Sequence, residues 1–352
     1  MSSYVIVGAG ISGATIARIL ADSGKRVSVF ELENHVGGAC YDIFQYGIPV
    51  CQFGCHVFHT KEEEVWNFVN RFSEFYPYEL RVIAKTNGEL YPMPINLLTL
   101  REFGFQNPRQ AREYFRNLPF VGNKNFEEVA ISSIGGHLYK KFFYEYTMKQ
   151  WGIDPKNLPS SIFNRLPVRF GADTRYFSDP HQGMPRDGYT RMIENMLDHK
   201  NINLRLGEKY DKDGSRVIYT GSIDEYHKYK MGFLEYRSIA YKWEINDEDE
   251  YGSPLINYVS MEEDFTRIVT FNHFYPHKNA SKFISAIEYP GSYSENCGKR
   301  LYPIPTEENL RLYEEYKVIE SKAIFAGRLG SYKYINMDVA VKNGIDLARS
   351  LL

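Results

Sequence analysis

The sequence is poor in cysteine, and its few cysteines follow no recognised pattern. Its 352 residues include four, at positions 40, 51, 55 and 297. Their spacing matches neither a C-x-x-C redox pair nor a zinc-binding set, and four are too few for a disulfide scaffold of this length. We therefore expect reduced, mostly structural thiols, no metal site and a cytoplasmic setting.

Long apolar runs and a strong charge of either sign are also missing. No run approaches the roughly 20 residues that a membrane span needs, and the start Met1-Ser2-Ser3 lacks the features of a signal peptide. The formal net charge is −2, which argues against nucleic acid or an anionic membrane as the partner. An anionic ligand must therefore be held by a few well-placed arginines.

Aromatic residues are abundant, at 15% of the chain, with 28 tyrosines and 23 phenylalanines. The simpler interpretation is a tyrosine-rich core and surface. The alternative is a cleft that stacks ring-shaped ligands, because tyrosine combines an apolar face with a polar tip. Composition alone favours the simpler interpretation.

The start of the chain predicts a strand, a glycine-rich turn, a helix and a second strand. The strands are expected at residues 4–7 and 27–30, and the helix at residues 14–23. The turn at residues 8–13 has the pattern G-x-G-x-x-G, which in this context is typical of a dinucleotide-binding unit.

Each glycine of that turn has a physical role in binding a dinucleotide. Gly8 permits the tight turn, Gly10 lets the backbone approach a pyrophosphate, and Gly13 lets the helix pack closely. The helix N-terminus, which contains Ser12, offers N–H groups to the phosphates. Glu31 follows at the end of the second strand, the position expected for a ribose-binding carboxylate.

A second glycine pair, Gly37-Gly38, follows shortly after Glu31. The pair resembles the pattern of flavoproteins with two dinucleotide-binding segments, in which the chain passes the FAD pyrophosphate a second time. The two motifs together favour FAD over NAD.

The rest of the chain predicts interleaved domains in an α/β fold. Short β-like runs at residues 216–219, 255–259 and 283–287 predict an antiparallel layer. We expect a Rossmann-like FAD-binding domain with an inserted helical subdomain and an antiparallel β-sheet layer. The predicted segments are residues 1–70, 180–225 and 306–352 for the FAD-binding domain, 97–162 for the helical insertion, and 71–96, 163–179 and 226–305 for the sheet-based substrate domain.

Further motifs resemble the UDP-galactopyranose mutase family along nearly the whole chain. They lie in the same order as in that family and are more specific than the glycine turn. They are Phe53-Gly54-Cys55-His56-Val57-Phe58-His59-Thr60, Met93-Pro94-Ile95-Asn96, Tyr146-Thr147-Met148-Lys149-Gln150-Trp151-Gly152, Arg165-Leu166-Pro167-Val168-Arg169-Phe170, Leu234-Glu235-Tyr236-Arg237-Ser238, Thr266-Arg267-Ile268, Tyr302-Pro303-Ile304 and Gly327-Arg328-Leu329-Gly330.

The resemblance implies a flavin-dependent isomerase of UDP-sugars. Such an enzyme interconverts UDP-galactopyranose and UDP-galactofuranose through a covalent adduct between flavin N5 and the sugar, and it needs reduced FAD. NADPH or NADH is the expected reductant, galactofuranose biosynthesis the expected route, and a homodimer is left open.

The same resemblance assigns roles to individual residues. Arg165 and Arg267 are expected to act on the diphosphate, and His56 beside the flavin. The expected substrate-binding residues are Phe142, Tyr146, Thr147, Trp151, Tyr176, Arg237, Tyr302, Tyr334 and Asn336. The expected cofactor-binding residues are Gly8, Gly10, Ser12, Gly13, Glu31, Gly37, Gly38, His56, Arg328, Met337 and Asp338.

Four positions depart from the family pattern. Glu33 replaces an arginine near the FAD, Leu80 an asparagine near the sugar, Cys55 a small residue, and Asn336 an aspartate. Leu80 is compatible with a different sugar, for example a deoxy or N-acetylated one, and equally with drift. Two other functions stay open: an FAD-dependent oxidoreductase of the amine-oxidase type, and a catalytically silent FAD- or UDP-sugar-binding protein.

Overall fold

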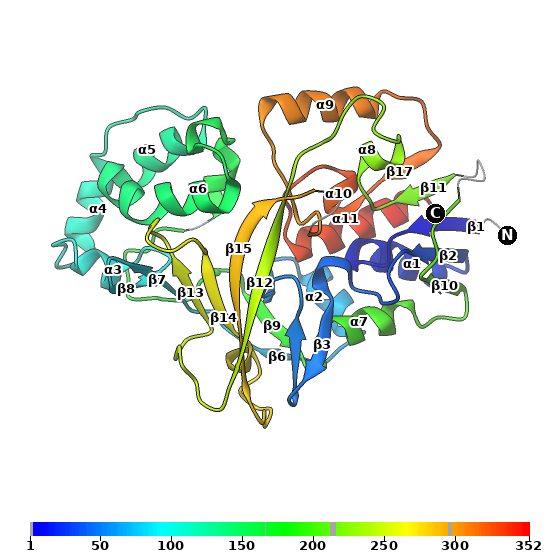
Figure 1. Cartoon of the computed structure of the whole chain (residues 1–352), viewed down its shortest axis with the longest axis horizontal. Helices are drawn as coiled ribbons and strands as arrows, with labels where there is room; N and C mark the ends of the chain where they lie inside the picture. Colours follow the sequence, from blue (N-terminus) through cyan, green and yellow to red (C-terminus); the bar gives the residue numbers. More distant parts are fainter. Residues whose placement is uncertain (1–2, 166, 212–215, 295–297) are drawn as a thin grey trace. The chain divides into compact units, whose positions relative to one another are not determined.

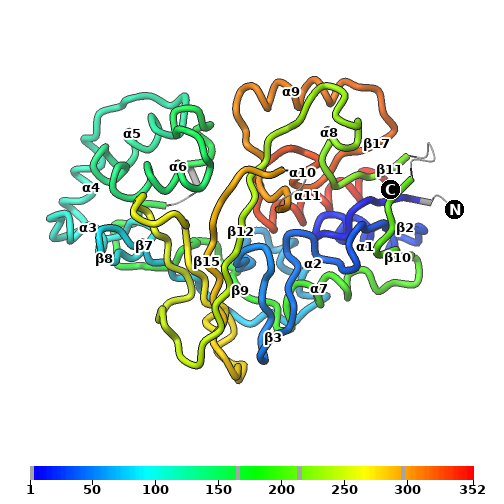
Figure 2. The backbone as a smooth tube through the Cα atoms, in the orientation of Figure 1, coloured from blue at the N-terminus to red at the C-terminus, as the bar shows by residue number. Residues whose placement is uncertain are grey.

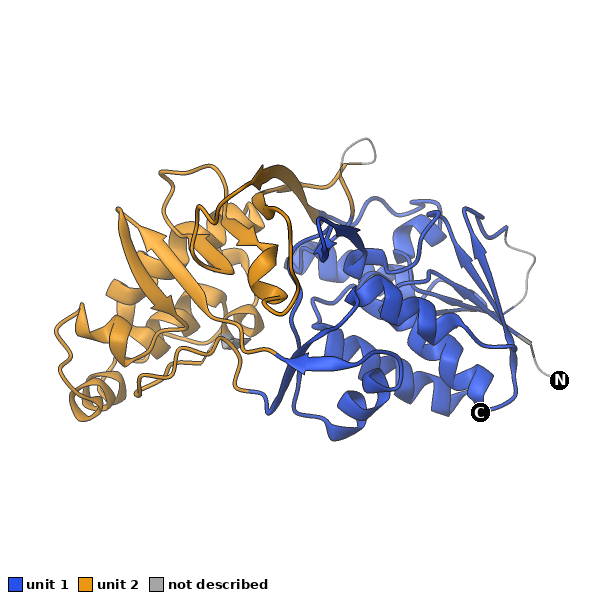
Figure 3. Ribbon diagram, turned by 90° about the horizontal axis from the view of Figure 1, so that it is seen from below, with its two compact units in different colours: residues 1–77, 179–236, 300–352 blue, residues 78–178, 237–299 orange. Residues whose placement is uncertain are grey.

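The chain forms two compact units, each assembled from separated segments. The computed structural model describes residues 3–165, 167–211, 216–294 and 298–352, without the side chains of residues 3, 164 and 165. Unit 1 comprises residues 1–77, 179–236 and 300–352, and unit 2 comprises residues 78–178 and 237–299 (Figure 3).

Unit 1 is built on a five-stranded parallel sheet. The strand order is β10-β2-β1-β11-β17. This order runs outward in both directions from β1, as in one half of a Rossmann fold, where ligands bind at the carboxyl ends of the strands near the reversal of order. The strands are β1 (Ser3–Val7), β2 (Arg26–Glu31), β10 (Ile202–Leu206), β11 (Val217–Tyr219) and β17 (Ala323–Phe325).

Helices α1 and α11 pack closely against each other in unit 1 (Figure 1). The approach depends on Gly344, where a Cβ atom would lie 3.0 Å from the Thr15 side chain. The helices of unit 1 are α1 (Ile11–Asp22), α2 (Glu63–Asn70), α7 (Gly188–Leu197), α8 (Ile223–Tyr226), α9 (Glu307–Lys317), α10 (Gly327–Gly330), α11 (Met337–Ser350) and the 3₁₀ turn η1 (Gly38–Cys40).

Two small antiparallel sheets complete unit 1. They are the hairpin β3-β4 and the sheet β5-β9-β6. Their strands are β3 (Asp42–Gln45), β4 (Ile48–Cys51), β5 (Phe58–Thr60), β6 (Phe75–Pro77) and β9 (His181–Pro185), and the short strand β16 (Tyr302–Pro303) also lies in this unit. Strand β1 and the C-terminal end of α11 lie side by side (Figure 2), and the Tyr4 hydroxyl donates to the Leu351 carbonyl at 2.7 Å.

Unit 2 contains a sheet in the order β12-β15-β14-β13-β7-β8. All neighbours are antiparallel except β13 and β7, which pair in parallel. The strands are β7 (Val82–Thr86), β8 (Glu89–Met93), β12 (Tyr236–Asn246), β13 (Leu255–Tyr258), β14 (Arg267–Thr270) and β15 (Phe283–Ser292). The expected antiparallel layer is therefore a mixed sheet.

Most helices of unit 2 lie between residues 97 and 165. Asparagine side chains cap three of their N-termini, at Asn96, Asn107 and Asn125. The helices of unit 2 are α3 (Leu97–Arg101), α4 (Pro108–Arg116), α5 (Phe126–Tyr139), the π-helical turn η2 (Lys140–Tyr144), α6 (Glu145–Trp151), and the 3₁₀ turns η3 (Pro155–Asn157), η4 (Ser160–Arg165) and η5 (Phe271–Phe274). Gly135, with φ 81°, kinks α5.

The observed fold confirms the expected α/β class and corrects one strand. The run at residues 216–219 was expected in the antiparallel layer, but β11 pairs in parallel with β1 and β17. Residues 71–77 and 226–236 belong to unit 1, together with the parallel sheet. Within the described part of the chain, no helix combines the length and apolar character needed to cross a membrane.

Candidate functional site

The glycine-rich turn joins β1 to α1 at the point where the sheet order reverses. Gly8 has φ 103°, a conformation that L-residues rarely adopt. A Cβ at Gly13 would lie 2.0 Å from the Gly8 carbonyl oxygen, so helix and turn touch backbone to backbone. Gly10 differs, because a Cβ there would come no closer than 3.8 Å to the Gly38 Cα. The protein itself therefore leaves room at Gly10.

The second glycine pair lies against the first turn. Gly10 and Gly37 form a parallel β-bridge, and the Gly37 N–H donates to the Ala9 carbonyl at 3.0 Å. Gly37 and Gly38 both have positive φ, at 109° and 55°. The structure thus brings both predicted pyrophosphate-binding segments together.

Glu31 ends β2 beside this turn. Its two carboxylate oxygens accept from the main-chain N–H groups of Ala9 at 2.8 Å and Glu33 at 3.0 Å. The carboxylate therefore has a fixed orientation next to the turn. The Glu33 side chain is exposed at this edge.

The N-terminus of α11 lies close to the second glycine pair. The Cys40 thiol donates to the Met337 sulfur at 3.5 Å, and burial raises the pKa of Cys40 to about 12. Asp338 stands in the first turn of α11, and partial burial raises the pKa of its carboxyl. A Cβ added at Gly327 would lie 3.2 Å from the buried Ser12 hydroxyl, so α10 also reaches this region.

These residues fit a bound dinucleotide. The α1 N-terminus has a glycine N-cap and no side-chain cap, so its first N–H groups are available to phosphate oxygens. The absence of any close contact to a Cβ at Gly10, where the nearest atom would lie at 3.8 Å, matches a close approach by a pyrophosphate. The α11 N-terminus supplies a second helix end whose partial positive charge favours an electron-rich group.

Arg328, Tyr302 and Tyr334 form one cluster in unit 1. The guanidinium lies 5.6 Å from the Tyr302 ring centroid and 5.7 Å from that of Tyr334, and the two rings meet edge to face at 5.3 Å. Arg328 also donates to the carbonyls of Leu301 and Ile335, at 3.1 and 2.9 Å. These bonds fix a cation between two tyrosines.

His56 and Asn336 also belong to unit 1. The buried Tyr189 hydroxyl donates to the His56 carbonyl at 3.0 Å, and the two rings meet edge to face at 6.4 Å. Asn336 is the N-cap residue of α11, with its carbonyl accepting from the Ala340 N–H at 3.0 Å. Tyr189 thus positions the backbone that carries the histidine.

Arg267 and Tyr146 meet in unit 2. The guanidinium Nη2 donates to the Tyr146 hydroxyl at 2.8 Å. Glu288, the β15 residue paired with Arg267, places Oε2 at 3.3 Å from the guanidinium Nε. Glu288 is 1% exposed, and this burial raises the pKa of its carboxyl, while Arg267 opposes the rise. The Arg267 guanidinium is thus held at Nε by the Glu288 carboxyl group and at Nη2 by the Tyr146 hydroxyl.

The other predicted residues around α6 are largely buried. Phe142 packs edge to face on Tyr91 and Phe103 at 5.1 and 5.7 Å, while Thr147 and Trp151 are 4% and 7% exposed. In this conformation Phe142 is therefore a core residue of the helical part.

Arg237 binds the C-terminal end of α6. Its guanidinium donates to the carbonyls of Lys149 and Gln150, each at 3.0 Å, and to the Ser292 hydroxyl at 3.4 Å. Gly152, with φ 71°, ends the helix where a Cβ would lie 2.6 Å from the Arg237 Nη1. The described contacts of Arg237 thus hold the helix that carries Tyr146 and Trp151.

Three remaining positions can be placed in unit 2. The Tyr176 N–H donates to the Leu80 carbonyl at 2.7 Å, and the Leu80 side chain is buried. Arg165 is the last residue of η4, but its side chain lies outside the described residues. Its expected contact with a diphosphate stays a prediction.

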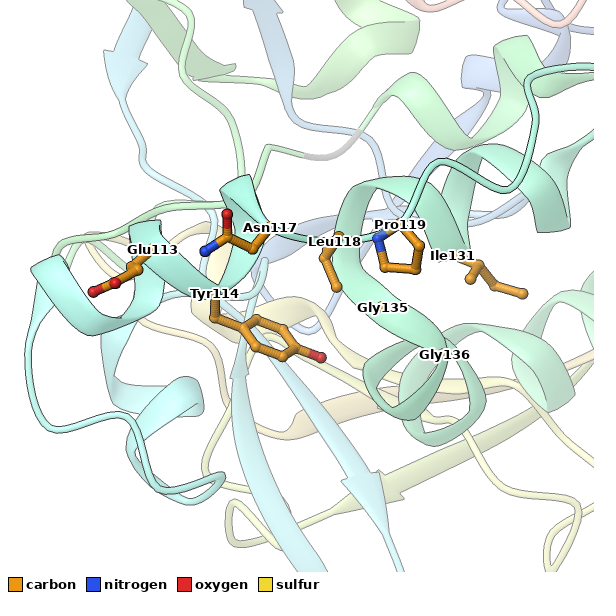
Figure 4. A pocket seen from close by; sticks show the side chains of 8 residues that line it. All are labelled: Glu113, Tyr114, Asn117, Leu118, Pro119, Ile131, Gly135 and Gly136. Carbon is orange, nitrogen blue, oxygen red and sulfur yellow. The ribbon is translucent and has the colours of Figure 1, made fainter.

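The helical part of unit 2 contains a cavity of about 480 Å³ between α4 and α5 (Figure 4). Tyr114 points toward the kinked segment of α5, where a Cβ at Gly135 would lie 2.7 Å from its hydroxyl. None of the predicted site residues lines this cavity. Among the described residues, no group of three or more His, Cys, Asp or Glu side chains is arranged to hold a metal ion.

Comparison with known proteins agrees with this arrangement. A family model for UDP-galactopyranose mutase matches residues 141–334, and one for an NAD(P)-binding Rossmann-like domain matches residues 6–72. A probable UDP-galactopyranose mutase of Klebsiella pneumoniae is 38% identical over 99% of this chain and 94% of its own length. The chain belongs to the UDP-galactopyranose mutase family. Membership of this family implies a mutase that carries a flavin.

Other relatives of this chain differ in their named substrate. The dTDP-fucopyranose mutase of Escherichia coli is 35% identical, over 99% of this chain and 98% of its own length. The UDP-galactopyranose mutase of Mycoplasma genitalium is 30% identical, over 99% and 94%. Membership in the family therefore leaves the sugar and the nucleotide open.

Solved structures share the fold. A crystal structure of reduced UDP-galactopyranose mutase matches with a TM-score of 0.75 at 14% identity, covering 100% of this chain and 94% of that one. A putative protoporphyrinogen oxidase from Exiguobacterium matches with a TM-score of 0.68 at 11% identity, covering 99% and 98%. The mutase fold is thus shared with a protein named as an oxidase.

Sequence reasoning missed two groups beside the predicted residues. Glu288 lies behind Arg267, and Lys149 lies on α6 between Tyr146 and Trp151. Glu288 is remote from Arg267 in the sequence, and only the pairing of β14 with β15 brings the two together. A signal for Glu288 was its place directly after the mostly apolar strand-like run at residues 283–287, since a buried charge needs a partner.

Proposed function

We propose that the protein is a flavin-dependent mutase that interconverts the pyranose and furanose forms of a nucleoside-diphosphate hexose. The observation that carries the proposal is the hydrogen bond between Arg267 and Tyr146, with Glu288 paired to the same guanidinium. In unit 1 of the same chain, the two glycine segments at residues 8–13 and 37–38 lie against each other, as expected for a dinucleotide site. When bound, reduced FAD supplies a nucleophilic nitrogen for the anomeric carbon of the sugar.

The main electrostatic task of the protein is to stabilise the negative charge of the leaving diphosphate. The planar guanidinium of Arg267 suits phosphate oxygens, because it can donate two parallel hydrogen bonds. The Tyr146 hydroxyl beside it can donate without adding charge. We assign the same task to Arg165, on the family resemblance. Holding UDP or dTDP in place keeps it ready to attack the sugar again in its other ring form.

The cofactor is assigned to unit 1. The turn with Gly8, Gly10 and Gly13 is proposed to hold the FAD pyrophosphate, and Glu31 the ribose. Arg328 and the N-terminus of α11 are proposed to lie near the isoalloxazine, where a cation and a positive helix end favour the anionic reduced form. His56 is proposed to lie at the same ring.

UDP-galactose is the first candidate substrate and dTDP-fucose the second. The second is favoured by Leu80, an apolar residue where the family often has asparagine, and by the similarity to the dTDP-fucopyranose mutase. Fucose is a 6-deoxy sugar, so it lacks one hydroxyl that a polar residue would bind. An apolar residue at position 80 fits a sugar that lacks this hydroxyl.

The test is anaerobic turnover of FAD-loaded protein, followed by chromatography of the nucleotide sugars. UDP-galactofuranose, UDP-N-acetylgalactofuranose and dTDP-fucofuranose are compared, each with dithionite-reduced and with oxidised protein. We expect conversion to the pyranose only with reduced flavin, and no net flavin oxidation, which separates a mutase from an oxidoreductase. Equal rates in both redox states would rule out the proposed chemistry.

The two diphosphate arginines are tested by Arg267→Ala and Arg165→Ala. Each change is expected to lower kcat/KM by about 10²-fold or more, since a charged group that stabilises the transition state contributes several kcal/mol. The flavin absorbance of both variants should match the parent protein. Near-normal turnover in both variants would remove the assignment.

A further inference from the structure

Lys149 makes an unusual set of contacts with the connection between β13 and β14. Its ammonium nitrogen lies within hydrogen-bond distance of four main-chain carbonyl oxygens. They belong to Tyr258, Ser260, Glu263 and Phe265, at 2.8, 2.5, 3.1 and 2.9 Å. An ammonium has three N–H donors, so these carbonyls can satisfy all of them without water.

The contacts span the whole connection. Tyr258 is the last residue of β13, and Phe265 lies two residues before Arg267, where β14 begins. One side chain thus ties down the start, the middle and the end of this segment, residues 259–266. Burial lowers the pKa of Lys149, whereas the nearby Glu263, Glu145 and Asp264 carboxylates oppose that change and favour the charged ammonium.

A second contact from the same helix reinforces the first. The Glu145 carboxylate accepts from the Met261 N–H at 2.6 Å. Glu145 and Lys149 are four residues apart and therefore share one face of α6. Both ends of a single helical turn hold the same segment.

Helix α6 and the segment 259–266 position the two residues to which we assign the diphosphate. Tyr146 lies on α6, Arg267 begins β14, and their side chains meet at 2.8 Å. We propose that Lys149 is a positioning residue, which fixes Arg267 against Tyr146 by holding segment 259–266 to α6. This inference rests on the proposed function, since it assigns the Arg267–Tyr146 pair to a nucleoside diphosphate.

Direct binding of the phosphates by Lys149 is a less suitable role. Its donors already point at main-chain carbonyls, and moving the ammonium to a ligand would leave those carbonyls without it. A cation that orders a loop acts before the ligand arrives. Its effect therefore appears as weaker nucleotide binding together with a looser loop.

The experiment removes the ammonium and then returns it. Lys149→Ala deletes the side chain beyond Cβ, and propylamine supplies the missing three carbons and nitrogen. Tetramethylammonium at equal concentration is the control for ionic strength, because it has charge but no N–H donor. Lys140→Ala is the matched protein control, an exposed lysine on the neighbouring π-helical turn.

Two quantities are measured on the FAD-loaded protein: amide hydrogen exchange in residues 259–266 and the Kd for UDP by calorimetry. For Lys149→Ala we expect faster exchange and a Kd raised roughly tenfold or more, as for the loss of charge-assisted hydrogen bonds. Propylamine should restore both, whereas tetramethylammonium should restore neither. Lys140→Ala should match the parent protein in both.

An unchanged Kd in Lys149→Ala overturns the proposal, whether or not the loop exchanges faster. Failure of propylamine to restore a raised Kd overturns it too. Should Lys149→Ala fail to fold, Lys149→Arg replaces it. Its planar fork keeps the charge but cannot aim at four converging carbonyls, so a Kd equal to that of the parent protein would overturn the proposal. Failure of the proposed function is distinguishable, because the parent protein itself would then show no nucleotide binding.

Discussion

At the scale of single residues, the first turn needs glycine at positions 10 and 13 for different reasons. A Cβ at Gly13 has no room, since it would meet the Gly8 carbonyl oxygen at 2.0 Å. A Cβ at Gly10 meets only ordinary distances, and the residue has φ −75°, which any residue adopts. Gly13 is therefore needed by the fold, whereas we propose that Gly10 is needed by the ligand.

We predict that Gly10→Ala keeps the fold and loses FAD, whereas Gly13→Ala destabilises the protein even without FAD. The added methyl at position 10 fills the space that a pyrophosphate needs. Flavin absorbance after gel filtration and the melting temperature of the apoprotein check both statements. Normal FAD content in folded Gly10→Ala would contradict the assignment of this turn to the pyrophosphate.

A second residue-scale prediction concerns the thiols. The pKa of Cys40 is raised to about 12 by burial, so at pH 8 only about one thiol in 10⁴ is ionised and reactive. We expect iodoacetamide to leave Cys40 unmodified in the native protein at pH 8 and to label it after unfolding. Peptide mass spectrometry gives the answer, and rapid native labelling of Cys40 would show that it is not buried.

A third residue-scale prediction concerns Glu288, whose carboxyl group lies next to the Arg267 guanidinium. Burial raises the folded-state pKa of Glu288 above its ordinary value of 4.5, so its contribution to stability is complete below that value and falls as pH rises through the folded-state pKa. The unfolding free energy of Glu288→Gln should therefore rise relative to the parent protein between pH 4.5 and 8. Urea titrations at several pH values measure this difference. A difference independent of pH would mean that Glu288 is not buried as described.

The sequence predicts some of these residue-level features and not others. Gly8, Gly10 and Gly13 are readable because their roles depend on neighbours within a few positions. Glu288 and Lys149 are not, because their partners come from strand pairing and from a loop that is remote in sequence. These contacts form only when the sheet of unit 2 has formed.

At the scale of elements, the C-terminal end of α6 depends on Arg237. A helix end carries carbonyls without partners and a partial negative charge, which a cation stabilises. Arg237 meets that need with hydrogen bonds to the carbonyls of Lys149 and Gln150. The family resemblance assigns Arg237 to the substrate instead, and the two roles predict different phenotypes.

We predict that Arg237→Met lowers the free energy of unfolding by about 2–3 kcal/mol, the magnitude for hydrogen bonds to a charged group. Arg237→Lys should recover only part of this loss, because one ammonium cannot reproduce the fork. Urea unfolding followed by circular dichroism measures both variants. Unchanged stability together with lost UDP binding would instead favour the substrate role.

The elements also show where local patterns stop being informative. The helical insertion expected at residues 97–162 contains the π-helical turn η2, and the strand at residues 217–219 joins the parallel sheet. Neither the extra residue of a π turn nor the direction of a three-residue strand leaves a periodic signal. The parallel pairing of β13 with β7 likewise joins two segments that are far apart in the sequence.

At the scale of the whole molecule, the predicted residues are distributed unevenly between the two units. All eleven positions predicted to bind the cofactor, from Gly8 to Asp338, belong to unit 1. The substrate-binding positions lie in both units, with Tyr146 and Arg267 in unit 2 and Tyr302 and Tyr334 in unit 1.

This distribution predicts that the two ligands protect different parts of the chain. A ligand that binds only the native state stabilises it by about 2.7 kcal/mol at a concentration of 100 Kd, and local opening is suppressed where the contacts lie. Removing FAD should therefore speed amide exchange in residues 6–41 and 324–345 and leave α4 and α5 almost unchanged. UDP added to the holoprotein should then slow exchange in α6 and in residues 259–270. Equal loosening of α4 and α5 on FAD removal would mean that the cofactor is not confined to unit 1, whereas UDP protection confined to unit 1 would remove Tyr146 and Arg267 from the nucleotide site.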